Sequence, residues 1–345
     1  MNVIVSGGTF DDSGDGILWH VDLERGSAET VLLHRPPPGL SVKGKGFTGA
    51  SWLGPPGQSE LLVCGFNAVY RVSASRWEVT GLLHQPCMND LHHVAVIQGK
   101  VYVVNTGLDS VDVFDVAGRF VGSHCTGPAW LQARRLSGVS PSRSDWQGLL
   151  DPGWDLRSFE AADSPPRGAY YETRSSVEQP FHQRVVRDYV HPNHIAEVGN
   201  RLLCTRLADS RVVDLRTLET VIDDFPGHPH DGVVMGGQVW LTCVGGYVVS
   251  FEPSDPPPWP PVHVLDIVAT TGRSGWCRGL LVRDDVLVVG LTEIRQASAY
   301  FWRDAPFAGT ETSVLVIDKS TGRLLQRVDL TDRKRHSKIY SVLPL

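Results

Sequence analysis

Three histidines occupy similar places in this chain, each just ahead of a short apolar run. His92 precedes a Val-Ala-Val run, His194 precedes Ile-Ala, and His230 is followed after one aspartate by Gly-Val-Val. Imidazole nitrogens bind zinc, iron and copper, and three protein ligands leave a coordination position open for water or a substrate. If the three runs are equivalent strands, the sequence predicts one divalent transition metal (zinc, iron or copper) bound by His92, His194 and His230.

The first ligand depends on strand register. His92 and His93 are adjacent, and successive side chains of a strand point to opposite faces of the sheet. A slip of one residue would therefore exchange one histidine for the other. We take His92 as the ligand and keep His93 as the alternative.

Polar residues near these histidines are candidates for the chemistry. His191 and His228 stand in the parallel motifs His-Pro-Asn-His and His-Pro-His, where either could be a base. Asp231 could orient an imidazole by accepting its second N–H. An arginine at the matching place in the last repeat could bind a carboxylate or phosphate, and the cysteine before it is a weaker fourth ligand. The candidate catalytic residues are His191, His228, Arg278, Glu293 and Tyr300, with Cys277 as the possible fourth ligand.

A repeated pattern supplies the elements that must position these residues. Short runs rich in β-branched and aromatic residues follow one another through polar turns, in units of about 40 residues, which is typical of four-stranded propeller blades. One unit is split, because the first residues supply only its later strands and residues 338–343 supply its first. Such a split closes a ring and removes free sheet edges. The sequence predicts an all-β, six-bladed β-propeller as a single domain over residues 1–345, with units opening near Thr48, His92, His194, His230, Cys277 and Ile339.

Two long insertions interrupt the pattern. Residues of about 125–190 join a fourth strand to a first, and residues of about 290–312 join a second strand to a third. In an antiparallel sheet both connections lie at the end where the first strand starts. We therefore expect both insertions to form a lid over the channel mouth that carries the histidines.

Composition narrows the class of protein. The net charge is −6 and 41% of the 345 residues are hydrophobic, which suits a globular chain and makes nucleic acid an unexpected partner. No apolar run approaches a membrane span, and no signal peptide precedes the first strand. The six cysteines are scattered, with no C-x-x-C pair. A cytoplasmic location is expected.

The carboxy-terminal third carries residues that point to a family. It contains Arg-Gly-Leu at 278–280, Val-Val-Gly-Leu-Thr-Glu-Ile-Arg at 288–295 and Ile-Tyr-Ser-Val-Leu-Pro at 339–344. With these residues it resembles an uncharacterised bacterial family of conserved hypothetical propeller proteins, which implies the fold and no activity. The expected architecture is also similar to that of the peptide-amidating lyase, a six-bladed propeller with three zinc-binding histidines on its axis, and to the carotenoid-cleaving oxygenases.

These observations lead to three functional hypotheses. The first is a metal-dependent enzyme of lyase or hydrolase type that acts on a small polar or anionic substrate. The second is an iron- or copper-dependent oxidoreductase that activates oxygen at the same histidines. The third is a non-catalytic propeller whose mouth binds a ligand or a partner protein.

Overall fold

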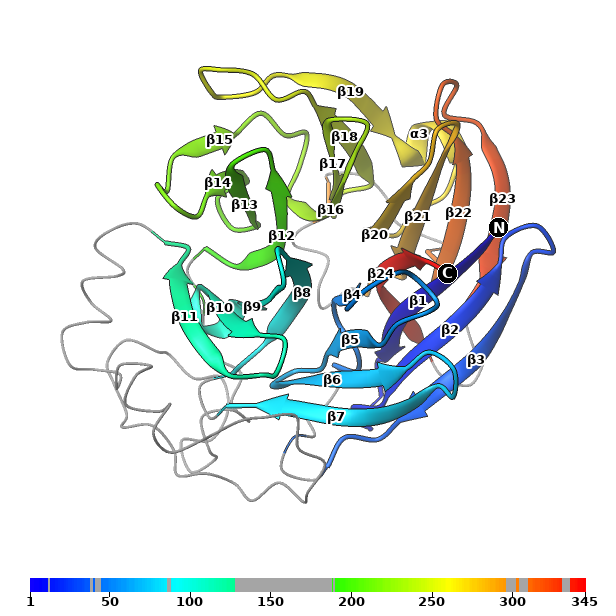
Figure 1. The fold of residues 1–345 in the computed structure, drawn as a ribbon. Helices are drawn as coiled ribbons and strands as arrows, with labels where there is room; N and C mark the ends of the chain where they lie inside the picture. Colours follow the sequence, from blue (N-terminus) through cyan, green and yellow to red (C-terminus); the bar gives the residue numbers. More distant parts are fainter. Residues whose placement is uncertain are drawn as a thin grey trace.

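The structure is a computed structural model of the chain. It describes residues 1–11, 13–37, 40, 45–85, 88–127, 188, 190–295, 302–303, 310–330 and 336–345. These residues form six four-stranded antiparallel sheets arranged as blades around one axis (Figure 1). The predicted six-bladed β-propeller is confirmed.

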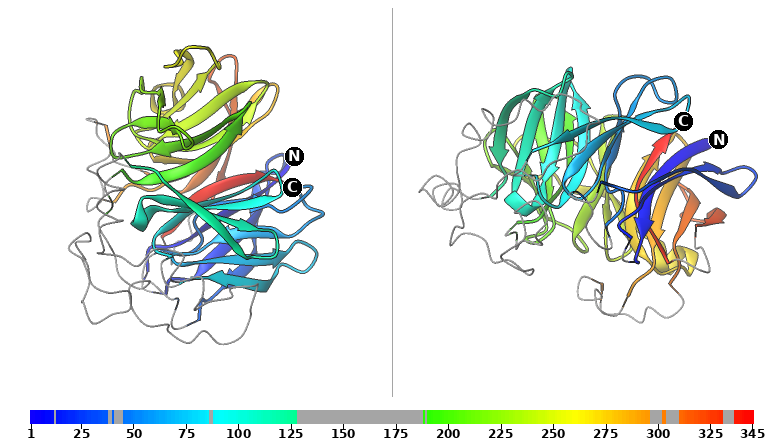
Figure 2. Two further views of the ribbon diagram at one scale, coloured as in Figure 1. Left: turned by 60° about the vertical axis from the view of Figure 1, so that its left-hand side comes forward. Right: turned by 90° about the horizontal axis from the view of Figure 1, so that it is seen from below.

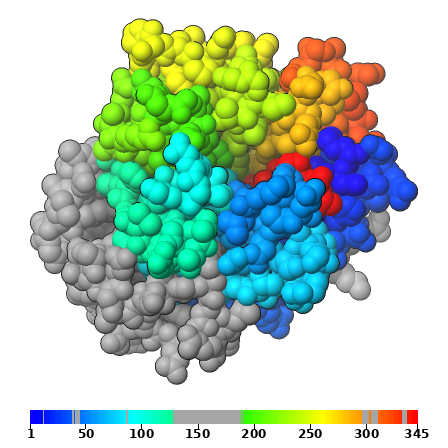
Figure 3. Space-filling view, viewed as in Figure 1, coloured from blue at the N-terminus to red at the C-terminus, as the bar shows by residue number. Residues whose placement is uncertain are grey.

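The first blade closes the ring with strands from both ends of the chain. Strand β24 pairs antiparallel with β1, and the two termini lie close together in both views of Figure 2. In the space-filling view, the red carboxy-terminal residues lie against the blue amino-terminal residues on one side and the orange residues of the last blade on the other (Figure 3). Blade 1 consists of β24 (Ser337–Pro344), β1 (Asn2–Thr9), β2 (Gly16–Asp22) and β3 (Ser27–His34).

The other five blades follow in chain order, each with its first strand nearest the axis (Figure 1). Blade 2 consists of β4 (Ala50–Trp52), β5 (Leu61–Cys64), β6 (Ala68–Ser73) and β7 (Glu78–His84). Blade 3 has β8 (Leu91–Ile97), β9 (Lys100–Asn105), β10 (Ser110–Asp115) and β11 (Phe120–Cys125). Blade 4 has β12 (Pro192–Val198), β13 (Arg201–Arg206), β14 (Arg211–Asp214) and β15 (Thr220–Ile222). Blade 5 has β16 (Pro229–Met235), β17 (Gln238–Cys243), β18 (Tyr247–Phe251) and β19 (Pro261–Asp266), and blade 6 has β20 (Trp276–Val282), β21 (Val286–Thr292), β22 (Ser313–Asp318) and β23 (Leu324–Asp329).

The hydrophobic core lies between neighbouring blades. Side chains of the middle strands alternate between the two faces of each sheet, so one face packs on the blade before and the other on the blade after. Val94 of β8 and Leu62 of β5, for example, belong to one buried cluster that joins blades 2 and 3. Each such fully buried side chain stabilises the fold by about 1.5–3 kcal/mol. The packed blades hold the inner strands rigidly around the channel.

Two short helices in the described residues lie in connections between strands. A turn of 3-10 helix, η2 (Thr106–Leu108), follows β9, and α3 (Ile267–Thr271) follows β19.

The bounds of the strands show where the longer insertion lies. Strand β11 ends at Cys125 and β12 begins at Pro192, so the longer insertion joins a fourth strand to a first, as predicted. Its ends meet at Asp109, whose carboxylate accepts the Val190 N–H at 3.0 Å and whose carbonyl accepts the Thr126 N–H at 3.0 Å. The predicted lid over residues 128–187 lies outside the described residues.

The second insertion joins β21, which ends at Thr292, to β22, which begins at Ser313. This agrees with the predicted second-to-third connection. Within the described ranges, no helix is both long enough and apolar enough to cross a membrane.

Candidate active site at the channel mouth

The inner strands β8, β12 and β16 carry the predicted histidines at one end of the channel. His92, His194 and His230 are all buried, with exposed fractions of 5%, 6% and 1%. Each strand has a register shift near its start, where one extra residue is left out of the pairing with the second strand of its blade. Such a bulge redirects a side chain and changes the alternation along the strand. The bulges therefore decide which polar side chains meet.

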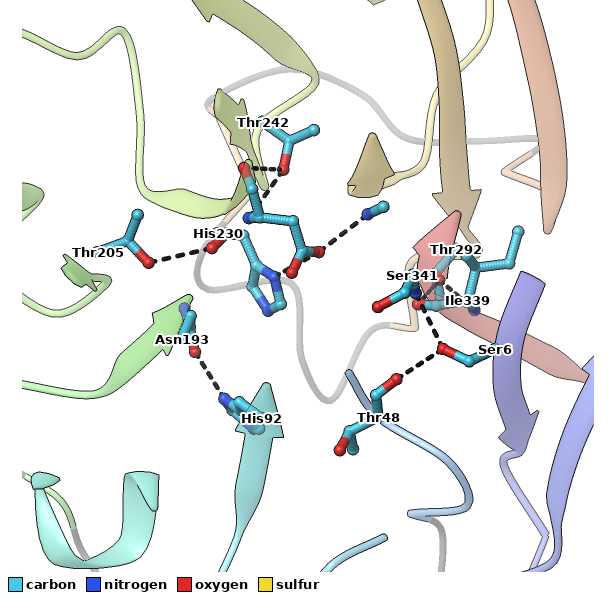
Figure 4. Close-up of polar contacts among 12 residues, drawn as sticks. Ser6, Thr48, His92, Asn193, Thr205, His230, Thr242, Thr292, Ile339 and Ser341 are labelled. Carbon is cyan, nitrogen blue, oxygen red and sulfur yellow. Dashed lines mark hydrogen bonds and ion pairs between the residues drawn. The ribbon is translucent and has the colours of Figure 1, made fainter. Parts of the chain in front are cut away.

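The bulges align His92 with Asn193 instead of His194. His92 is the extra residue of β8, and Asn193 is the extra residue of β12. Their side chains face each other, and His92 Nδ1 donates to Asn193 Oδ1 at 2.6 Å (Figure 4). His194 comes one residue later and packs against His93, with ring centroids 4.2 Å apart. His194 therefore shares its register with His93, the alternative kept above, and not with His92, since His93 and His194 each directly precede the apolar residues of their strand.

The three predicted ligands consequently do not converge on one point. The His230 ring lies 6.0 Å from the His92 ring between centroids, whereas His194 is engaged by His93. In the part of the chain that the structure describes, no group of three or more His, Cys, Asp or Glu side chains is placed to hold a metal ion. The arrangement does not fit the predicted ligand set of His92, His194 and His230.

His230 is instead half of a buried histidine–aspartate pair. Its Nδ1 lies 2.9 Å from Asp231 Oδ2, and the same carboxylate oxygen accepts the Gly279 N–H at 2.9 Å (Figure 4). Asp231 thus contacts and orients an imidazole as the sequence suggested. Although burial raises the pKa of Asp231, His230 and the other donors hold that pKa well below its usual value. The ionised Asp231 carboxylate therefore accepts a hydrogen bond from His230, and the proton of the neutral imidazole is on Nδ1.

The other nitrogen of His230 carries the lone pair. His230 Nε2 is buried and has no hydrogen-bond partner among the described residues. Burial lowers the pKa of His230 to about 4, so the imidazole is neutral at neutral pH. An oriented neutral imidazole with a free Nε2 is able to take a proton from a bound molecule.

Three cationic side chains gather beside this pair. The Arg278 guanidinium lies between two aromatic rings, with its central carbon 4.8 Å from the centroids of both Trp276 and Tyr340. Lys338, on the neighbouring strand β24, is only 3% exposed. Lys45 precedes β4, and its charge acts on both Arg278 and Tyr340. All of these side chains come from the starts of inner strands or from the segments just before them.

The carboxylate of Asp90 links one of these cations to the histidines. Lys45 Nζ lies 2.5 Å from Asp90 Oδ1, and the same oxygen lies 3.4 Å from His92 Nε2. Burial raises the pKa of Asp90, but Lys45 and His92 outweigh it and hold the pKa well below the usual value. Arg278 and Lys338 have no carboxylate partner within the described part of the chain.

The remaining predicted residues are dispersed. His191 is near the site, since its ring lies 4.8 Å from that of His92, and its Nδ1 contacts Asp188 at 2.9 Å. His228 contacts Ser210 Oγ at 3.0 Å. Glu293 contacts His336 Nδ1 at 2.9 Å. Cys277 is buried in the core between blades 5 and 6, where burial raises the pKa of its thiol, and Tyr300 lies outside the described residues.

Several residues of this cluster were not predicted as functional. Tyr340 was placed in the closing strand only, although it is the extra residue of a bulge in β24, as His92 is in β8. A polar or aromatic residue between the second and fourth positions of the first strand is the signal that could have found it. The residues that sequence reasoning missed are Lys45, Asp90, Asn193, Lys338 and Tyr340.

Comparison with known proteins supports the fold. No protein-family model matches the chain, and no curated protein matches it. A chain in a crystal structure of a nidogen/laminin complex is similar over 99% of this chain and 97% of that one, with a TM-score of 0.56 and 11% identity. Putative 6-phosphogluconolactonases from Bacteroides fragilis and Bacteroides uniformis align over 94% of this chain and 80% and 81% of theirs, with TM-scores of 0.47 and 0.46 and identities of 10% and 11%. At 11% identity, the likeness to the nidogen/laminin chain concerns the fold alone.

Proposed function

We propose that the channel mouth binds a small anionic substrate and that His230, oriented by Asp231, acts on it as a general base. The enzyme would be of lyase or hydrolase type, since both reactions begin with removal of a proton from carbon or from water. The observation that carries the proposal is the cluster of Lys45, Arg278 and Lys338, the last of them buried and the other two half-buried, beside the free Nε2 of His230.

The charge balance of the cluster favours an anion. Burying a cation costs free energy unless a counter-charge or a strong acceptor accompanies it. Asp90 contacts Lys45, and Asp231 is engaged by His230 and Gly279. The charges of Arg278 and Lys338 are therefore available to an anionic ligand. The contacts of the Arg278 guanidinium with two aromatic rings fix its plane, and a planar guanidinium binds a carboxylate or phosphate through two N–H groups.

Unpaired donors support the same conclusion. Trp276 Nε1, Arg278 Nε and Asn193 Nδ2 are buried and have no hydrogen-bond partner among the described residues. Buried N–H groups without an acceptor are uncommon in folded proteins, and each costs about 1–3 kcal/mol. The oxygens of an anionic ligand would satisfy them.

This acid–base proposal takes the place of the metal-dependent one. The described side chains do not supply three ligands to one ion. They do supply an oriented base and a set of cations, which a purely structural channel lining would not require. A non-catalytic ligand-binding role would use the cations but not the free Nε2 of His230.

Thermal unfolding with and without inorganic phosphate or acetate tests the binding step. At a concentration about ten times its Kd, an anion stabilises the folded state by about 1.4 kcal/mol, which raises the Tm of a chain of this length by about 2 °C. We expect Arg278→Gln and Lys338→Met to abolish this shift. The exposed residues Arg323 and Lys100 provide matched controls as Arg323→Gln and Lys100→Met. Equal shifts in all four variants, or no shift with either anion, would contradict the proposal.

A further inference from the structure

Tyr340 occupies a special position on the closing strand. In β24, Ser341 pairs with Ser6 and Ile339 pairs with Gly7, so Tyr340 is the extra residue of the bulge. Its side chain is 5% exposed. Within the described residues no acceptor takes a hydrogen bond from its hydroxyl group. This oxygen is not among the fully buried polar atoms that lack a partner, so the hydroxyl is accessible to a molecule bound at the proposed site.

The groups around Tyr340 are mostly cationic. Arg278 of β20 stacks on its ring at 4.8 Å, Lys338 lies on the same strand, and Lys45 reaches it from the segment before β4. The carboxylate of Asp90, ahead of β8, opposes these cations with a smaller effect on Tyr340. Three cations against one carboxylate favour the phenolate, because opposite charges stabilise the ionised form.

We propose that Tyr340 is the general acid of the site and donates its phenolic proton to the leaving oxygen of the substrate while His230 removes a proton on the other side. This assignment rests on the proposed function for the existence of the substrate. The evidence specific to Tyr340 is the set of cations around its ring and hydroxyl group.

The proton count of this step balances. His230 Nε2 gains a proton from a carbon atom of the substrate or from water. In an elimination the electron pair left on carbon forms a carbon–carbon double bond as the bond to the leaving oxygen breaks; in a hydrolysis the oxygen of the deprotonated water bonds to the electrophilic atom as that atom's bond to the leaving oxygen breaks. In both cases the leaving oxygen forms a new O–H bond as the Tyr340 O–H bond breaks. The products are an imidazolium and a phenolate, and exchange with solvent restores both groups. No oxidant or reductant is needed.

Electrostatics suits Tyr340 to this role. Burial raises the pKa of Tyr340, but Lys338, Lys45 and Arg278 outweigh it and lower the pKa to about 8. Burial lowers the pKa of Lys338 to about 8 as well, so these two groups titrate as a coupled pair. A general acid works best when its pKa is close to the operating pH. An ordinary tyrosine, with a pKa of about 10, would be a weaker donor.

The same cations couple Tyr340 to ligand binding. An anion bound to Arg278 and Lys338 offsets part of their positive charge, and the phenolate then loses stabilisation. Binding should therefore raise the pKa of Tyr340 and keep the phenol protonated. By linkage, the affinity for the anion should fall as Tyr340 ionises.

A spectrophotometric pH titration of the full chain tests the inference, because tyrosinate absorbs in the near ultraviolet where tyrosine does not. Of the eight tyrosines, we expect one to ionise near pH 8 in a separate first step. Tyr340→Phe should remove this step, and Lys338→Met should move its midpoint upward by about one pH unit. Tyr247→Phe is the matched control, since an arginine also stacks on that ring at 5.0 Å, and it should leave the step unchanged.

The outcomes separate this inference from the proposed function. If no tyrosine ionises before the main step, or if the early step survives in Tyr340→Phe with a native circular dichroism spectrum, Tyr340 is not the acid. If the step is present, adding inorganic phosphate should raise its midpoint by about half a pH unit. A normal early step that phosphate does not move would leave the assignment of Tyr340 intact and count against anion binding.

Discussion

The burial of His194 predicts a specific loss of stability in acid. This side chain is 6% exposed and stacks on His93, so its charged form would lose hydration and face a second imidazole. Burial lowers the pKa of His194 from 6.5 to about 4. As the pH is lowered, His194 is protonated near pH 6.5 in the unfolded chain but only near pH 4 in the folded chain. The free energy of unfolding therefore decreases as the pH falls from about 6.5 to about 4.

The size of this effect follows from the two pKa values. With 6.5 in the unfolded state and about 4 in the folded state, linkage gives a loss of about 2.5 kcal/mol at about pH 4.5 relative to neutral pH. The loss amounts to about 1.4 kcal/mol per pH unit in the middle of the window. This is a substantial part of the stability of a typical domain.

Urea unfolding at several pH values isolates the contribution of His194. In His194→Gln the group that titrates is absent, so the free energy of unfolding should fall less steeply than in the wild type, by up to about 1.4 kcal/mol per pH unit between pH 6 and 4.5. His263→Gln, at an exposed histidine of β19, is the control and should keep the wild-type slope. Parallel pH profiles for the wild type and His194→Gln would refute the reasoning, whatever their absolute stabilities.

Three further predictions concern the mouth. Asp231→Asn should cost about 1–3 kcal/mol in urea unfolding, because the charged oxygen that accepts from both His230 Nδ1 and the Gly279 N–H is replaced by a weaker, neutral acceptor; an unchanged free energy of unfolding would contradict the assigned pair. Lys338→Met should raise the free energy of unfolding at neutral pH by about 1–3 kcal/mol by removing a buried charge without a carboxylate partner, and a loss of stability would argue that this charge is already satisfied. Protein purified without an affinity tag should contain less than about 0.2 equivalents of zinc, iron or copper, and one tightly bound equivalent would restore the metal hypothesis with a different ligand set.

The propeller itself could be predicted from local patterns. Four short strands per unit, turns between them and a unit split between the two ends of the chain already imply a closed ring of blades. The positions of both insertions followed from strand polarity, and β11, β12, β21 and β22 begin or end where that argument placed them. The sequence also indicated that Asp231 could orient an imidazole by accepting its N–H, and Asp231 Oδ2 lies 2.9 Å from His230 Nδ1.

The membership of the site could not be predicted in the same way. The patterns took His92 as the equivalent of His194 and kept His93 as the alternative, and in the structure His92 meets Asn193 whereas His194 packs against His93. The bulge near the start of each inner strand decides which of two adjacent residues points where, and hydrophobic periodicity does not mark a bulge.

The sequence by itself determined the fold, the ring closure and the end of the channel at which polar residues gather. These properties depend on the order of strands and on the alternation of side chains along each one. Only the tertiary structure decided which side chains meet there. Lys45, Arg278, Lys338 and Tyr340 are remote in sequence and become one cluster because closure of the ring brings β24 between β20 and the segment before β4.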